Sequence, residues 1–167
     1  MSDSSSYFGS FNSPLGNINI SASDTGITAL QFIEQPTLSD EGNEIIEHCK
    51  RELNAYFSGI LKDFSVPLDL KCSDFQQQVL AHVKTVQLGT TSSYLQVAKT
   101  LLMPTASRAI GLANSKNKIL ILIPCHRIIG SSGSLVGYAG GLERKQWLLA
   151  HEAKVCGITR RQLSLQF

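Results

Sequence analysis

A run of five apolar residues, Ile119 to Ile123, limits most strongly how this chain can fold. The run does not alternate between apolar and polar positions, so it predicts a short strand or extended segment that is buried on both faces. Pro124 follows directly, and its ring fixes φ and removes a backbone donor. The sequence therefore predicts that the next residue, Cys125, leaves a buried segment at a rigid turn.

Cys125 is followed by His126 and Arg127. Only a thiolate is a strong nucleophile, and a free thiol is mostly protonated at neutral pH. Activating the thiol would need a base or a positive charge, and these two residues are the nearest candidates. The alternative is a core cysteine beside a hydrogen-bonded histidine, which is the commoner meaning of an arbitrary Cys-His pair.

The composition predicts a globular protein that stays in the cytoplasm. The chain has 167 residues, of which 43% are hydrophobic and 17% charged, enough for one ordinary domain or two small ones. It contains no apolar stretch as long as a membrane span, and its first residues lack the layout of a signal peptide. We therefore expect no membrane partner.

The cysteines and histidines predict neither disulfides nor a metal site. They lack C-x-x-C and H-E-x-x-H spacing, and a reducing compartment favours free thiols. The residues concerned are Cys49, Cys72, Cys125, Cys156, His48, His82, His126 and His151. We expect no metal and no cofactor.

Charge divides the chain into two unlike halves. Residues 1–70 hold three Lys/Arg against ten acids, a net charge of −7, whereas residues 71–167 hold twelve against three, a net charge of +9. The second half would face a polyanion such as nucleic acid, although a basic surface often serves only solubility. The switch coincides with an extended segment around Pro67, so we place a domain boundary there, between residues 1–68 and 69–167.

The N-terminal domain is expected to be an antiparallel pair of strands packed with one helix. Leu15–Ser21 alternates, residues 23–26 supply turn chemistry, and Ile27–Phe32 returns as the second strand. A helix is expected to begin at Ser39–Gly42 and to end near Gly59. None of these residues suggests catalysis, so the domain is expected to be structural.

Three helices are expected at the start of the second domain. A capping box, Ser73-x-x-Gln76, precedes the first, and Ser92 or Ser93 caps the second. The third follows Met103-Pro104 with Thr105 as its cap, and it carries one long cation, Arg108, among small residues. The last two helices fit either a helix-turn-helix or a plain helical hairpin.

A glycine-rich segment and a final helix follow the cysteine. Residues 131–141 predict a mobile hairpin or loop that could close over a ligand. Leu142–His151 predicts a helix, with Glu152 at its C-terminal end, where the helix dipole disfavours a carboxylate unless a donor offsets it. His126 is a candidate donor, which would give a Cys-His-Glu relay. The alternative for Glu152 is a solvated helix end.

Residues 123–129, Ile-Pro-Cys-His-Arg-Ile-Ile, resemble the active-site signature of the O6-alkylguanine-DNA alkyltransferases, and the resemblance covers about residues 73–153. Further matching segments are Ser93-Tyr94, residues 107–111, Asn117, residues 138–142 and Lys145 to Glu152. The resemblance implies an α/β (α+β) fold, with a small antiparallel-sheet N-terminal domain. It also implies a mostly helical C-terminal alkyltransferase and DNA-binding domain with a winged helix-turn-helix-like motif.

The resemblance also implies a reaction. Cys125 would take the alkyl group from O6-alkylguanine in DNA, and we expect the same for O4-alkylthymine, in a single irreversible turnover. His126, oriented by Glu152, would accept the thiol proton through a water. Tyr94 would donate to the departing base, and Asn117 would brace the site.

Recognition of DNA is implied as well. Arg108 would enter the base stack from the minor groove of double-stranded DNA as the damaged base flips out. Tyr94, Gln76 and Ser131 match positions that contact the DNA. The residues assigned to the alkyl pocket are Ile128, Tyr138, Ala139, Gly140 and Lys145. We expect a monomer that binds DNA with possible cooperativity and associates with the nucleoid when bound.

The chain departs from the family pattern at three places: Lys118 replaces a proline, Ala139 a serine, and Leu80 or Ala81 a tryptophan. Loss of the serine hydroxyl puts the rate on methyl adducts in doubt. Two other functions are alternatives to alkyl transfer. A non-enzymatic alkyltransferase-like lesion binder would lack Cys125, and a Cys-His-Glu hydrolase would not need a basic helix-turn-helix.

Overall fold

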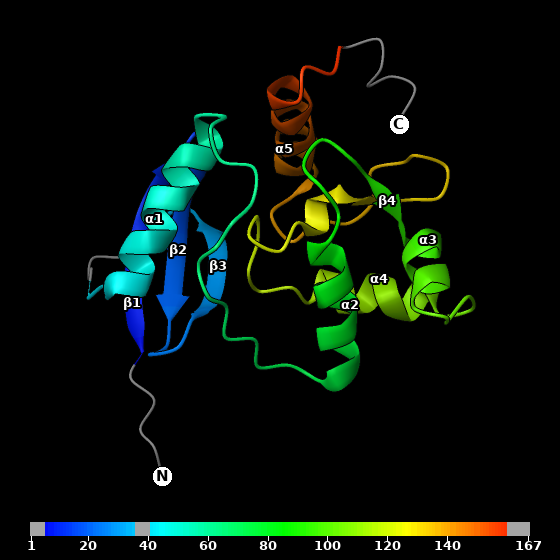
Figure 1. Cartoon of the computed structure of the whole chain (residues 1–167), viewed down its shortest axis with the longest axis horizontal. Coiled ribbons are helices and arrows are strands. Elements are labelled where there is room, and N and C mark those ends of the chain that lie inside the picture. Colours follow the sequence, from blue (N-terminus) through cyan, green and yellow to red (C-terminus); the bar gives the residue numbers. More distant parts are fainter. Residues whose placement is uncertain (1–5, 36–40, 160–167) are drawn as a thin grey trace. The chain divides into compact units, whose positions relative to one another are not determined.

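The computed structural model describes residues 6–35 and 41–159 (Figure 1). Contacts divide the chain into two compact units, residues 1–71 and 72–167, which are described separately. The class is mixed α and β, as predicted. The structural role predicted for residues 1–68 stays a prediction. In the described ranges, no helix is long and apolar enough to cross a membrane.

The N-terminal unit is a three-stranded antiparallel sheet with one helix (Figure 1). Its strands are β1 (Tyr7–Ser13), β2 (Gly16–Ala22) and β3 (Ile27–Ile33), with β2 in the centre, and its helix is α1 (Glu44–Phe57). Alternation in β2 buries Ile18 and Ile20, while α1 buries Ile46 and Leu53. The sheet and the helix therefore each bury one apolar face.

Two expectations for this unit need correction. The predicted pair of strands omitted β1, whose sequence YFGSFNS alternates poorly and is recognisable as a strand only through its pairing with β2. The helix is capped by Asn43, whose side chain accepts from the Ile46 N–H, and not by Ser39–Gly42. Of that predicted cap, Ser39 and Asp40 lie outside the described residues.

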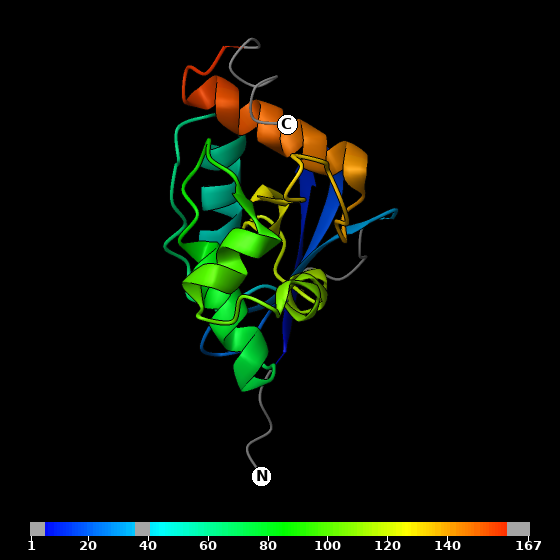
Figure 2. The same cartoon turned by 90° about the vertical axis from the view of Figure 1, so that its right-hand side faces the viewer.

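The C-terminal unit is mostly helical (Figure 1 and Figure 2). In chain order its elements are α2 (Asp74–Lys84), β4 (Ser92–Ser93), α3 (Tyr94–Thr100), α4 (Ser107–Ser115), the single 3-10 turn η1 (Cys125–Arg127), β5 (Ile128–Ile129) and α5 (Leu142–Val155). Helix α4 packs against both α2 and α3, and β4 pairs in parallel with β5. The pairing places the start of α3, where Tyr94 lies, beside the segment that follows Cys125.

The predicted capping box at Ser73 is present, and the predicted cap of the second helix is Ser93, which forms a capping box with Gln96. The predicted cap at Thr105 is wrong, because α4 begins at Ser107 after Ala106 and has no side-chain cap. Helix α4 buries Ile110, Ala113 and Asn114, whereas Ala109 is exposed.

The strand predicted for Ile119 to Ile123 is wrong. The five residues are buried, but they form tight turns in which Leu122 N donates to Leu120 O and Ile123 N donates to Ile119 O. Ile121 has a φ of +70°, a conformation that β-branched residues rarely adopt. A segment buried on every side gives the same apolar run whether it is extended or turned, so the run alone could not distinguish the two.

We predict that Asn43→Ala lowers the free energy of unfolding of the N-terminal unit by about 1 kcal/mol, because the first turn of α1 loses its cap. Urea denaturation measures the change. Asn43→Asp keeps the acceptor and is the control, expected to lose less. Equal losses for both variants would contradict the capping role.

Candidate active site

Cys125 lies at the start of η1, directly after Pro124, and is 3% exposed. Its backbone N–H donates to Ile123 O at 2.7 Å, and its thiol sulfur accepts from Asn117 Nδ2 at 3.2 Å. Burial raises the pKa of the thiol to about 11, although the Asn117 hydrogen bond and the positive charge of Lys145 act in the opposite direction. The resting thiol is therefore protonated and requires a proton acceptor to react.

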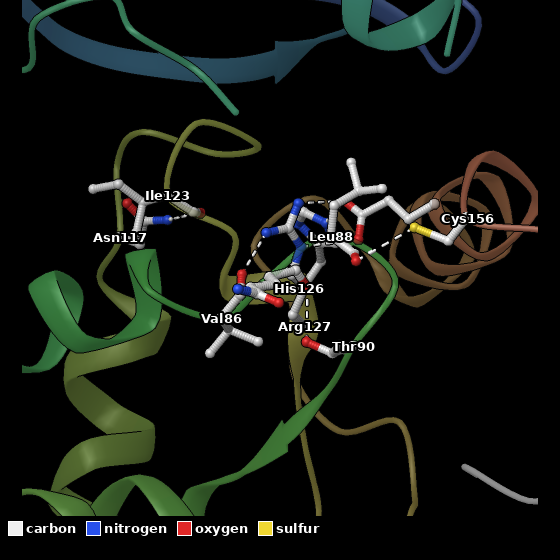
Figure 3. Close-up of polar contacts among 10 residues, drawn as sticks. Val86, Leu88, Thr90, Asn117, Ile123, His126, Arg127 and Cys156 are labelled. Carbon is white, nitrogen blue, oxygen red and sulfur yellow. Dashed lines mark hydrogen bonds and ion pairs between the residues drawn. The ribbon is translucent and has the colours of Figure 1, made fainter. Parts of the chain in front are cut away.

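Asn117 holds the turn that presents the cysteine (Figure 3). Its Nδ2 also donates to Ile119 O at 3.3 Å and to Ile123 O at 3.1 Å, and its Oδ1 accepts from Ile119 N at 2.9 Å. One buried carboxamide thus ties both ends of the apolar run to the thiol. The backbone shape that replaces the predicted strand depends on this side chain.

His126 is fully buried, and its Nε2 lies 2.7 Å from Glu152 Oε1. A carboxylate can only accept, so Nε2 carries the proton and the neutral ring has Nδ1 as its free acceptor. Nδ1 has no partner among the described residues. Burial, together with the positive charges of Arg127 and Lys145, lowers the pKa of His126, although Glu152 acts in the opposite direction. The ring is therefore a neutral base beside a protonated thiol.

Glu152 is fully buried within α5, so the alternative of a solvated helix end is wrong. Arg127 Nε donates to its Oε2 and Nη2 to its Oε1, each at 2.9 Å. Burial alone would raise the pKa of Glu152, but His126 and Arg127 together hold it well below its ordinary value. Arg127 was named beside the cysteine but was not predicted to hold the glutamate, since nothing in the spacing links residues so far apart.

Lys145 was predicted to line the alkyl pocket, and its ammonium group hydrogen-bonds to backbone carbonyls. The residue is fully buried, and its Nζ donates to Ile128 O at 2.6 Å, Val136 O at 2.9 Å and Gly137 O at 3.3 Å. Burial lowers its pKa to about 8. The side chain ties α5 to β5 and to the segment of residues 131–141, which is a loop with a tight turn at Gly130–Ser134.

The other residues predicted to line the alkyl pocket differ in how deeply they are buried. Ile128 is fully buried, and the Tyr138 ring lies edge-on to His126 with 6.2 Å between centroids. The Tyr138 hydroxyl is buried and has no partner in the described part of the chain. Gly140 is buried, whereas Ala139 is exposed on the loop.

A hollow of about 430 Å³ lies between α3, α4 and the segment after β5. Its lining residues are Tyr94, Leu95, Ser107, Arg108, Gly111, Gly130 and Ser131. Arg108 is exposed on α4, and the Tyr94 ring lies over Gly111 of that helix, where a Cβ would be in ordinary van der Waals contact with it at 3.7 Å. The structure thus brings Tyr94, Arg108 and Ser131 to one opening.

Gln76 does not line this hollow; its side-chain oxygen lies 3.3 Å from the Ser73 hydroxyl within the capping box. Across residues 6–35 and 41–159, no three His, Cys, Asp or Glu side chains are grouped so that they could hold a metal ion. All four cysteines are free thiols.

We predict that Lys145→Met, which keeps the apolar stem but removes the donors, loosens the loop of residues 131–141. Three carbonyls lose their partner, of which that of Ile128 is buried, and one buried unsatisfied group typically costs about 1 to 3 kcal/mol. Limited digestion with thermolysin should cut this loop sooner than in the unchanged protein. Lys154→Met, at an exposed position of the same helix, is the control, and equal cleavage of both variants would contradict the role given to Lys145.

Two family models match the chain. The model described as "6-O-methylguanine DNA methyltransferase, ribonuclease-like domain" matches residues 6–70. The model described as "6-O-methylguanine DNA methyltransferase, DNA binding domain" matches residues 74–154. The second match contains every residue of the site described above.

Curated relatives and solved structures agree with these models. A methylated-DNA–protein-cysteine methyltransferase of Methanosarcina acetivorans is 41% identical over 152 residues, covering 87% of this chain and 97% of the relative. One of Mycolicibacterium paratuberculosis is 42% identical over 147 residues, covering 85% and 89%.

The structure of Mycobacterium tuberculosis O6-methylguanine methyltransferase has a TM-score of 0.82 at 37% identity, covering 96% of this chain and 99% of that one. The M. tuberculosis protein OGT in complex with DNA has a TM-score of 0.81 at 39% identity, covering 89% and 93%. With both family models matched along most of its length, the chain belongs to the 6-O-methylguanine DNA methyltransferase family.

Proposed function

We propose that this protein repairs DNA by moving the alkyl group from O6 of a damaged guanine onto the sulfur of Cys125. The observation that carries the proposal is the buried thiol held by Asn117 beside a neutral histidine, whose other ring nitrogen is fixed by Glu152. The names of the relatives and the M. tuberculosis complex with DNA support the same reaction.

The chemistry is a single displacement at carbon. The bond between sulfur and the alkyl carbon forms while the bond between that carbon and O6 breaks. His126 accepts the thiol proton through a water, and Tyr94 donates its hydroxyl proton to the departing base. The imidazolium then releases its proton and the Tyr94 phenolate regains one, so the net reaction carries the thiol proton to guanine. Because a thioether does not leave again, each protein molecule acts once.

Binding to double-stranded DNA is assigned to the C-terminal unit, with α3 and α4 as the helix-turn-helix. Its half of the chain carries the net charge of +9. Arg108 would enter the stack from the minor groove, and the hollow beside Tyr94 would admit the flipped base. Ser131 at its rim and Gln76 at the start of α2 would contact the DNA backbone.

Several finer statements belong to the same proposal. The alkyl group would lie against Ile128, Tyr138, Ala139 and Gly140, with Lys145 holding the loop over it. O4-alkylthymine is the second expected substrate. We also propose a monomer with cooperative binding along DNA, located in the cytoplasm and on the nucleoid when bound. A non-enzymatic lesion binder is not favoured, because the cysteine and its relay are present.

The test is to incubate the protein with duplex DNA that carries a labelled methyl group on O6 of one guanine. We predict that the label moves to the protein in a one-to-one ratio and that peptide mapping places it on Cys125. Cys125→Ser should abolish transfer while DNA binding persists, since the thiol contacts no phosphate in this scheme. Label retained by that variant on Cys49, Cys72 or Cys156 would overturn the assignment.

A second prediction concerns Arg108. Arg108→Ala should slow repair in duplex DNA by about 100-fold, because unstacking a base costs a few kcal/mol that the arginine would help to offset. Reaction with free O6-benzylguanine should change little, since no base must be flipped. Lys99→Ala, at an exposed position on α3, is the matched control for loss of one positive charge. Similar losses on both substrates would show that Arg108 supports the fold instead.

A further inference from the structure

We propose that Arg127 is a positioning residue that keeps His126 neutral in the resting protein, so that the imidazole is available to accept the thiol proton. This inference deepens the proposed function and rests on it. It assigns the preparation of the proton acceptor to a residue that need not touch the substrate.

The geometry of the three side chains carries the inference. Glu152 Oε1 is shared, since His126 Nε2 lies 2.7 Å from it and Arg127 Nη2 donates to it at 2.9 Å. Glu152 Oε2 accepts from Arg127 Nε at 2.9 Å. The side chain of Arg127 is 6% exposed, and those of His126 and Glu152 are fully buried. The arginine therefore pairs with the carboxylate through both oxygens, out of contact with water.

The pairing of Arg127 with Glu152 sets the net charge of the buried cluster. With Arg127 present, the guanidinium and the carboxylate cancel, and a proton on His126 would leave one uncompensated charge in a buried cluster. Without Arg127, the guanidinium would no longer offset the charge of the buried carboxylate, and a proton on His126 would offset it instead. The arginine thus decides whether the buried cluster has no net charge with a neutral His126 or with a protonated one.

The net charge of the cluster also stays the same during the reaction. When the thiol proton reaches His126, the imidazolium and the developing thiolate form a second pair, so the cluster gains no net charge. If His126 were already protonated, the thiol proton would have no acceptor in the relay. Arg127 therefore favours the transfer by leaving the resting imidazole unprotonated.

The groups that face His126 are Cys125 in η1, the edge of the Tyr138 ring, Glu152 and Lys145 in α5, and Arg127. Besides Arg127, Lys145 is the group in this set that carries a positive charge. Lys145 acts on His126 with the same sign as Arg127, but its ammonium group is bound to three backbone carbonyls and not to Glu152. Replacing Arg127 leaves Lys145 in place, so a change in His126 would be due to the arginine.

Arg127 also has a structural contact that must be separated from this role. Its Nη1 donates to Val86 O at 2.5 Å and so anchors the loop between α2 and β4 (Figure 3). Cys156 anchors the same loop, because its thiol donates to Leu88 O at 3.4 Å (Figure 3). Cys156→Ala removes one anchor of the loop without removing a charge from the relay, which makes it the matched control.

The experiment measures the rate of alkylation by free O6-benzylguanine as a function of pH, so that DNA binding does not enter. In the unchanged protein, we expect the rate to fall only on the acid side of neutral. In Arg127→Met, the midpoint of that fall should rise by about one pH unit or more, so that at a pH below both midpoints the rate is lower by about tenfold for each unit of the shift. The rate should recover in alkaline buffer.

Two further variants sharpen the result. Arg127→Lys keeps the charge and should keep the midpoint, even where the maximal rate falls. Arg127→Met combined with Glu152→Gln removes both charges and should return the midpoint to the acid side. If Arg127→Met proves unfolded by thermal melting, these two variants decide, since a raised midpoint in either contradicts the proposal.

The outcome that overturns the inference is a lower maximal rate in Arg127→Met with an unmoved midpoint, because that is the effect of a structural anchor. A shift of equal size in Cys156→Ala would overturn it as well. Failure of the proposed function looks different, since the unchanged protein would then show no alkyl group on Cys125 at any pH.

Discussion

The buried carboxylate of Glu152 is the group on which the site depends. It joins α5 to η1 by accepting from His126 and from Arg127, residues that adjoin Cys125 in sequence. An unpaired carboxylate at this depth would be strongly destabilising, so the two donors are needed for the fold as well as for the chemistry. The same contacts fix the histidine tautomer and leave Nδ1 free to accept a proton. Stability and reactivity are thus set by one cluster.

A second buried group, the carboxamide of Asn117, decides where the thiol is presented. It holds Ile119 and Ile123 by their backbone and donates to the Cys125 sulfur. The turn that it stabilises includes Ile121 in a conformation with positive φ, which only strong surrounding contacts can maintain. Lys145 performs a similar task on the other side, where its ammonium group satisfies three carbonyls of β5 and the following loop. The buried polar side chains of Glu152, Asn117 and Lys145 therefore shape the site.

The sequence predicted those features that depend on local chemistry. The capping box at Ser73 and the cap at Ser93 are present because hydroxyl and amide groups three residues apart satisfy a helix start without help from distant residues. The strand β1 and the turn at Ile121 were missed, because each is fixed by partners elsewhere in the chain. The buried run before Cys125 and the adjacent His126 predicted a thiol beside a base, and the position of Glu152 at a helix end made it a candidate partner of His126; the family resemblance implied the same roles. The link from Arg127 to Glu152 could not be read from spacing, since it spans the loop and most of α5.

The chemistry of the site depends most directly on His126 being a neutral base in the resting protein, with its proton on Nε2. The nitrogen chemical shifts of its ring, measured by NMR on ¹⁵N-labelled protein from about pH 6 to about pH 8, test this claim directly. We predict shifts of a neutral imidazole throughout, with Nε2 protonated and Nδ1 unprotonated. Shifts of an imidazolium at neutral pH, or a proton on Nδ1, would contradict the account.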